Sequence, residues 1–152
     1  MNELNNVEIK NILDDNRLPN NGVFSKDLLP KELKNGWYII NMQNFSDGSG
    51  THWVCFKKGK QNIYFDSFGI IYPEIVKERL HNEPIYYNKK EIQNFKSSAC
   101  GYYCIGCIFA IEKMEIGDDI ERFNKYITRF SSLTSHNDEI LFTYLSNGGI
   151  TY

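Results

Sequence analysis

The sequence predicts an α+β fold, in which a small, mostly antiparallel β-sheet packs with a buried central helix in one domain over residues 1–152. Short segments rich in β-branched and aromatic residues alternate with turn residues, as is typical of antiparallel strands. The continuous apolar stretch at residues 99–114 predicts a helix that is buried on all sides. Amphipathic segments near both ends of the chain predict further helices, segregated from the sheet.

The elements follow in order from the spacing of the apolar residues. Residues 4–15 carry an amphipathic helical pattern that ends before turn-forming Pro19 and Gly22. Residues 23–24 and 28–30 are expected to be irregular segments with buried anchors. Strands are predicted at 37–42, 51–56, 62–68 and 84–88, with a turn-rich stretch at 44–50. Helices are predicted at 73–80, 99–114, 118–130 and from a capping box at 135–138 to about 146.

Composition and charge exclude several classes of protein. The 41% hydrophobic and 14% aromatic content is typical of a globular protein, and a net charge of -2 gives no sign of nucleic-acid binding. The N-terminal stretch MNELNNVEIKNILDDN lacks an apolar core, so no secretory signal is expected. The longest apolar run, residues 102–111, is too short to span a bilayer, so no membrane partner is expected.

A predicted hairpin places a histidine beside a carboxylate. If the hairpin is symmetric about Gly59, His52 lies directly opposite Asp66, and Val54 opposite Tyr64 on the same face. A lone histidine in a strand is most often structural. A carboxylate across the strand pair makes a functional role more attractive, because it can fix the imidazole tautomer and stabilise the imidazolium. The opposite face is apolar and should belong to the core; it carries Trp53, Cys55, Ile63 and Phe65.

The stretch NFKSSACGYYCIGCIFAI places a cysteine at the start of the buried helix. With Ser97 or Ser98 as the N-cap, Cys100 lies in the first turn, where the backbone N–H groups favour a thiolate. Gly101 would let other backbone or a substrate approach closely. The alternative is that Cys100 is a small core residue, as Cys104 and Cys107 are expected to be.

The spacing of the four cysteines, Cys55, Cys100, Cys104 and Cys107, argues against both a disulfide framework and a metal site. Cys100, Cys104 and Cys107 are crowded on one helix and cannot cross-link distant segments, so a reducing compartment is expected. Their spacing matches the three-cysteine motif of radical enzymes that hold an iron–sulfur cluster, but too few residues follow for the barrel of those enzymes. With His81 and His136 far from the motifs, no metal site is predicted.

Three motifs together resemble a known family. GTHWVCF, YFDSFG and IQNFKSSACGYYC, in this order, are similar to the adenovirus-type (adenain-like) cysteine proteases, which include enzymes of virophages and Maverick/Polinton elements. The upstream NNGVFSKDLLP and NGWYIINMQN look like the virophage and Polinton versions. Each motif alone is weak, whereas all three at these spacings are specific.

The resemblance implies a role for each matching residue. His52 matches the general base, Asp66 the carboxylate that orients it, and Cys100 the nucleophile. Gln93 matches the oxyanion-hole glutamine, with the backbone at Cys100 and Gly101 completing the hole. Taken alone, Gln93 would be assigned to the surface end of a strand. Trp53 also follows the histidine in the family and is a weak candidate for substrate contact, although core packing alone would explain it.

The resemblance further implies a viral protease that cleaves capsid or core precursor proteins during virion maturation. It would act in the virion and at the cytoplasmic assembly site of the infected cell, and we expect a monomer. Adenoviral members use DNA and a peptide cofactor attached to a cysteine upstream of the glutamine. Asn82 stands at that point here and the chain is slightly acidic, so no cofactor and a weak or absent dependence on DNA are predicted.

Two other functions remain open at this stage. An isopeptidase that removes ubiquitin-like modifiers of the SUMO type would share the order of the four residues, although its glutamine is usually one residue closer to the cysteine. A catalytically inactive protein-binding module could keep the fold, but the intact set of four residues argues against it.

Overall fold

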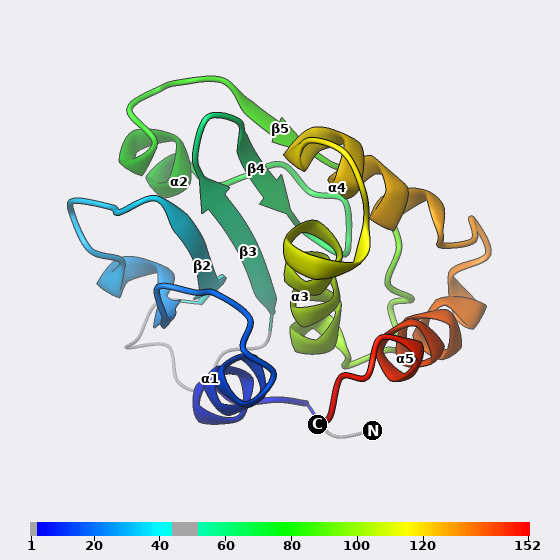
Figure 1. Cartoon of the computed structure of the whole chain (residues 1–152). Coiled ribbons are helices and arrows are strands. Elements are labelled where there is room, and N and C mark those ends of the chain that lie inside the picture. The colour runs from blue at the N-terminus through cyan, green and yellow to red at the C-terminus, as the bar shows by residue number, and fades with distance from the viewer. Residues whose placement is uncertain (1–2, 44–51) are drawn as a thin grey trace.

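The computed structural model describes residues 3–43 and 52–152 and combines one mixed β-sheet with helices (Figure 1). The predicted α+β class is confirmed. The strands are β1 (Val23–Ser25), β2 (Gly36–Asn41), β3 (Trp53–Lys58), β4 (Asn62–Phe65) and β5 (Ile85–Tyr87). The helices are α1 (Asn6–Asp15), α2 (Glu74–Arg79), α3 (Cys100–Phe109), α4 (Asp119–Thr128) and α5 (Asn137–Asn147), with short helical turns at η1 (Lys26–Leu28), η3 (Ala110–Met114) and η4 (Thr134–His136). The turn-rich stretch predicted at 44–50 lies outside the described residues.

The sheet has the order β1-β2-β3-β4-β5, with its longer strands in the middle. β2, β3 and β4 are antiparallel neighbours, as predicted, whereas the short edge strands β1 and β5 add in parallel. Residues 23–24 were expected to be irregular, and this prediction is wrong. Val23 pairs with Ile39 of β2, and a backbone hydrogen bond from Ile39 to Gly22 supports the start of the strand.

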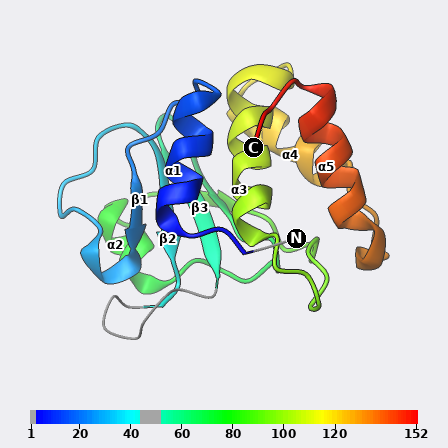
Figure 2. The ribbon, with the colours of Figure 1, turned by 90° about the horizontal axis from the view of Figure 1, so that it is seen from below.

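Helix α3 forms the centre of the molecule. Figure 2 shows it between the sheet on one side and α4 and α5 on the other. Each of its residues is buried, which confirms the prediction from the apolar stretch, and the π-helical turn η3 carries it on to Met114. Against it lie the β3 and β4 side chains predicted for the core face, namely Trp53, Cys55, Ile63 and Phe65.

The opposite face of the sheet has a smaller core of its own. Tyr38, Phe56 and Tyr64 are buried there against Val76 of α2 and the adjacent Leu80. Both faces of β3 and β4 are therefore covered by apolar side chains. A polar side chain at the end of either strand lies next to these buried groups.

The register of the β3–β4 hairpin differs from the prediction by two residues. Cys55 pairs with Phe65 and Phe56 with Tyr64, so the hairpin is centred on Lys60 and not on Gly59. β3 continues to Lys58, which shortens the loop, and the Gly59 N–H bonds to the Asn62 side chain within it. Because a shift of two residues preserves the alternation of side chains, His52 and Asp66 keep the same face.

The helix caps also differ from the prediction. The capping box predicted at 135–138 does not form: η4 precedes α5, and the N-cap residue His136 makes no side-chain cap. Capping boxes occur instead at α1, with Asn5 and Glu8, and at α4, with Asp118 and Glu121. Within the described part of the chain, no helix has the length and apolar character needed to cross a membrane.

Candidate active site

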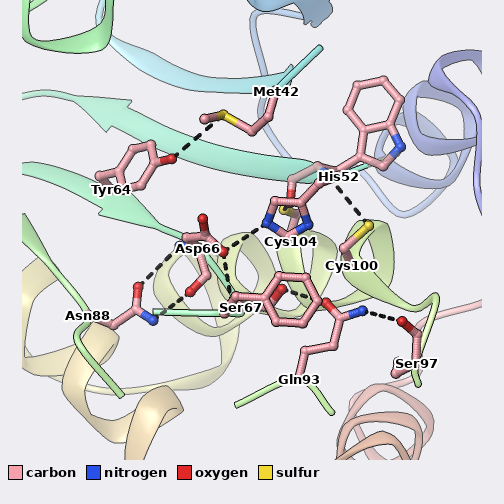
Figure 3. A network of polar contacts seen from close by, with 12 residues as sticks. Met42, His52, Tyr64, Asp66, Ser67, Asn88, Gln93, Ser97, Cys100 and Cys104 are labelled. Atoms are coloured by element: carbon pink, nitrogen blue, oxygen red, sulfur yellow. Dashed lines mark hydrogen bonds and ion pairs between the residues drawn. The ribbon is translucent and has the colours of Figure 1, made fainter. Parts of the chain in front are cut away.

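Three distant segments bring the predicted residues together at one end of the central strands. His52 directly precedes β3, Asp66 directly follows β4, and Cys100 is the first residue of α3. His52 Nε2 lies 2.8 Å from Asp66 Oδ1, which is a short, charge-assisted distance. Figure 3 shows the imidazole ring of His52 between Asp66 and Cys100. His52 and Asp66 therefore do not stand directly opposite each other, contrary to the prediction. They lie diagonally across the strand pair, and their side chains still make the predicted contact.

The carboxylate of Asp66 is fixed from several sides. It is 1% exposed, and its Oδ1 also accepts a hydrogen bond of 2.8 Å from the backbone N–H of Phe68. Asn88 holds the backbone of the same residue: its Oδ1 accepts from the Asp66 N–H at 3.1 Å and its Nδ2 donates to the Asp66 carbonyl at 2.7 Å. These contacts hold the buried charge in one orientation toward His52.

The imidazole of His52 is largely buried, with 16% of its side chain exposed, and its ring centre lies 4.8 Å from that of Phe68. Burial lowers its pKa, but the interactions of the ring first with Asp66 and then with Cys100 outweigh burial and raise the pKa to about 9. Its other ring nitrogen, Nδ1, is buried, and no hydrogen-bond partner for it lies among residues 3–43 and 52–152. A ring with one nitrogen occupied and one free can exchange a proton at the free position.

Cys100 lies in the first turn of α3, as predicted, and is 2% exposed. The predicted cap is wrong in detail, because Ala99 is the N-cap residue and no side-chain cap bond forms there. The hydroxyl of Ser97 instead accepts a hydrogen bond from the Ala99 N–H at 3.1 Å. The backbone N–H of Trp53 points at the Cys100 sulfur over 3.4 Å, so the residue after the histidine contacts the cysteine directly.

Gln93 is buried, with 1% exposure, and does not sit at an exposed strand end. Its side-chain amide donates from Nε2 to the Ser97 carbonyl at 2.8 Å, three residues before Cys100 in the chain. Its Oε1 accepts from the Ser67 hydroxyl at 2.6 Å. The amide nitrogen carries a second hydrogen, which is the group that the oxyanion-hole prediction requires. That catalytic role stays a prediction.

Gly101 and Trp53 have structural explanations. A Cβ at Gly101 would lie 3.2 Å from Ile9 and 3.3 Å from Leu4, so the missing side chain lets the N-terminal segment pack on α3. The indole of Trp53 is buried and donates to the Leu4 carbonyl at 2.9 Å. Core packing thus accounts for Trp53. A direct contact between its side chain and a substrate stays a prediction.

The other cysteines are core residues. Cys55, Cys104 and Cys107 are free and fully buried, and burial raises the pKa of each thiol. In residues 3–43 and 52–152 no group of three or more histidine, cysteine or acidic side chains is placed to hold a metal ion.

Sequence reasoning missed two residues of this region, Phe68 and Asn88. Phe68 packs against the imidazole with its ring tilted, and its backbone N–H donates to the carboxylate of Asp66; it lies inside the quoted motif YFDSFG. An aromatic residue two positions after the acid was the available signal, because alternate residues share a face. Asn88 gave no signal, since nothing in one sequence shows that β5 adds in parallel beside β4.

Comparison with known proteins finds similarity at the level of structure. No known protein family model matches the chain, and no curated protein matches it. Among solved structures, the chain is similar to the crystal structure of the ASFV pS273R protease, with 20% sequence identity and a TM-score of 0.46. The similarity covers 77% of this chain and 44% of that chain, so this chain spans less than half of that protein.

Proposed function

We propose that this protein is a cysteine endopeptidase in which Cys100 is the nucleophile, His52 the general base and Asp66 the residue that orients it. The observation that carries the proposal is the state of the imidazole. One ring nitrogen is bound to a buried carboxylate, and the other is buried with no hydrogen-bond partner in the described part of the chain. The ring lies between Asp66 and a cysteine at a helix N-terminus. A histidine packed for structural reasons would have both nitrogens satisfied or exposed.

The first chemical step follows from these contacts. The Cys100 thiol gives its proton to His52 Nδ1, which forms a thiolate and an imidazolium. The raised pKa of His52, about 9, favours the charged ring at neutral pH, and the Asp66 carboxylate stabilises it. The Trp53 N–H and the first-turn N–H groups of α3 favour the thiolate. The thiolate then attacks the carbonyl carbon of a peptide bond.

The remaining steps use the same groups in turn. The tetrahedral oxyanion accepts hydrogen bonds from the Gln93 amide and the backbone N–H of Cys100. As the carbon–nitrogen bond breaks, the imidazolium gives its proton to the leaving amine, and a thioester to Cys100 remains. Water, deprotonated by His52, attacks the thioester and releases the acid and the thiol.

The substrate that we propose is a viral capsid or core precursor protein, cleaved at the assembly site of an infected cell during maturation. This assignment is supported by the sequence resemblance to adenain-like proteases, which rests on GTHWVCF, YFDSFG and IQNFKSSACGYYC occurring in this order. We propose a monomer without a peptide cofactor. Dependence on DNA is proposed to be weak or absent, because the net charge is -2 and the Lys57 ammonium is paired with Glu112 and Asp119.

The proposal is tested by incubating the purified protein with three substrates in parallel: a virion capsid precursor, a SUMO conjugate and a ubiquitin conjugate. We expect cleavage of the precursor within its chain, no cleavage by Cys100→Ala, and rates that change little on addition of DNA. Turnover of the conjugates alone would show an isopeptidase. No turnover of any substrate, with no faster labelling of Cys100 by a thiol reagent than of a free cysteine, would support the inactive binding module.

A further inference from the structure

The side chain of Gln93 is held at both ends by groups from different parts of the chain. The Ser67 hydroxyl donates to its Oε1 at 2.6 Å, and the Ser97 carbonyl accepts from its Nε2 at 2.8 Å. Figure 3 shows the amide between these two residues. Ser67 is 0% exposed and Gln93 is 1% exposed, so the hydrogen bond between them is shielded from water.

These two partners decide which way the amide faces. A carbonyl oxygen only accepts hydrogen bonds, so the Ser97 contact requires the nitrogen of Gln93 on that side. The oxygen of Gln93 then faces Ser67, where it would be a buried, unpaired acceptor without the hydroxyl. With one N–H of the amide bonded to Ser97, the same nitrogen has one further N–H to offer to an oxyanion.

The residue that supplies this acceptor, Ser97, is itself held by a hydrogen bond from its side chain. The Ser97 hydroxyl donates to Asp138 Oδ1 at 2.9 Å, and the Tyr103 hydroxyl donates to the same oxygen at 2.8 Å. Tyr103 belongs to α3 and Asp138 to the first turn of α5. The segment that precedes Cys100 is therefore fixed to two helices. The Ser97 carbonyl, which accepts the hydrogen bond from Gln93, is held in place by these contacts.

Ser67 also connects Gln93 to the histidine and its carboxylate. It directly follows Asp66 in the chain, and its backbone carbonyl accepts from the N–H groups of both Ile92 and Gln93 at 2.9 Å. Three hydrogen bonds thus join residue 67 to the Gln93 segment, two from its carbonyl and one from its hydroxyl. His52, through Asp66, and Gln93, through Ser67, are therefore connected to the same short segment of the chain, residues 66–67.

We propose that Ser67 is a positioning residue, whose hydroxyl orients the Gln93 amide so that its free N–H serves the oxyanion. This inference rests on the proposed peptidase function for its catalytic consequence, whereas the orientation of the amide is a property of the folded protein. Ser67 does not touch the reacting atoms; it acts through Gln93.

The experiment compares the whole protein with Ser67→Ala, Gln93→Ala and the double variant. Removing a full oxyanion donor costs about 10²–10³ in kcat. Loss of orientation alone should therefore lower kcat by about 10-fold in Ser67→Ala, with KM changed less than twofold. In the Gln93→Ala background the same change should have no further effect on kcat. Ser131→Ala is the matched control, because that hydroxyl accepts from the Leu133 N–H away from the site, and it should keep wild-type kcat.

A second readout does not depend on turnover. The side-chain NH₂ signals of Gln93, assigned by their loss in Gln93→Ala, should exchange with solvent about 10-fold faster in Ser67→Ala than in wild type. Ser67→Cys keeps the volume of the side chain with a weaker donor and should lie between the two, which covers the case in which the alanine variant does not fold.

The outcomes separate the two claims. Unchanged Gln93 exchange in the folded Ser67 variants, or an equal loss of kcat with and without Gln93, would overturn the positioning role while the peptidase function stands. A wild-type protein without turnover would overturn the proposed function, and the exchange rates would still decide whether Ser67 orients the amide.

Discussion

The backbone N–H of Trp53 donates a hydrogen bond to the sulfur of Cys100 over 3.4 Å. The strand that begins next to His52 therefore also holds the cysteine in place, and a single backbone segment fixes both groups of the proposed catalytic pair. This arrangement makes the site sensitive to small changes in the packing of α3 against β3.

Replacement of Cys100 by alanine should abolish peptide cleavage and leave the fold intact. The sulfur is the proposed nucleophile, and the side chain is small, so its removal leaves little empty space. The measurement is turnover together with the thermal unfolding midpoint. Cys107→Ala, on the same helix and fully buried, is the control; it should keep activity at a stability cost of about 1 kcal/mol. Residual cleavage by Cys100→Ala would remove Cys100 from the mechanism.

Replacement of Asp66 by asparagine should lower the pKa of His52, because the neutral amide no longer stabilises the imidazolium. We expect kcat to fall at least about 10-fold and the basic limb of the pH profile to move to lower pH. NMR titration of the His52 ring measures the pKa directly. Asp14→Asn removes an exposed acid paired with Lys10 and should change neither quantity. A His52 titration that is the same in wild type and Asp66→Asn would contradict the account.

The stability of the protein should depend on pH through His52. Because the pKa of His52 is raised above its unfolded value, its contribution to the free energy of unfolding is fully present below about pH 6.5 and is lost as pH rises toward 9. The loss should be about 1 to 3 kcal/mol. Denaturant unfolding of wild type and His52→Ala at both pH values isolates this term. If the free energy of unfolding depended on pH equally in wild type and His52→Ala, His52 would not be the group responsible.

Replacement of Gly101 by alanine should destabilise the fold and leave the chemistry of folded molecules unchanged. The new methyl group would crowd Leu4 and Ile9, which we expect to cost about 1 kcal/mol or more, whereas the backbone N–H remains. Gly59→Ala is the matched control, since its Cβ would meet nothing closer than 3.9 Å. A fall in kcat with no loss of stability would instead indicate a direct role for Gly101 in the site.

The fold class, the buried helix and the pairing of His52 with Asp66 were accessible from the sequence, because burial and alternation leave strong periodic signals. The register of the hairpin was wrong by two residues, since loop length depends on contacts such as that between Gly59 and Asn62, which no pattern reveals. The hydrogen bonds that hold Gln93 could not be predicted, because Ser67 and Ser97 reach it from positions far apart in the chain.

The rate of alkylation of Cys100 as a function of pH, measured by mass spectrometry in wild type and His52→Ala, tests the central claim most directly. An activated thiolate predicts faster labelling of Cys100 at pH 6 than of a free cysteine, and a labelling rate in His52→Ala that falls to that of an ordinary thiol. Labelling of Cys100 at pH 6 that is no faster than that of a free cysteine, or that is unaffected by the loss of His52, would contradict the account.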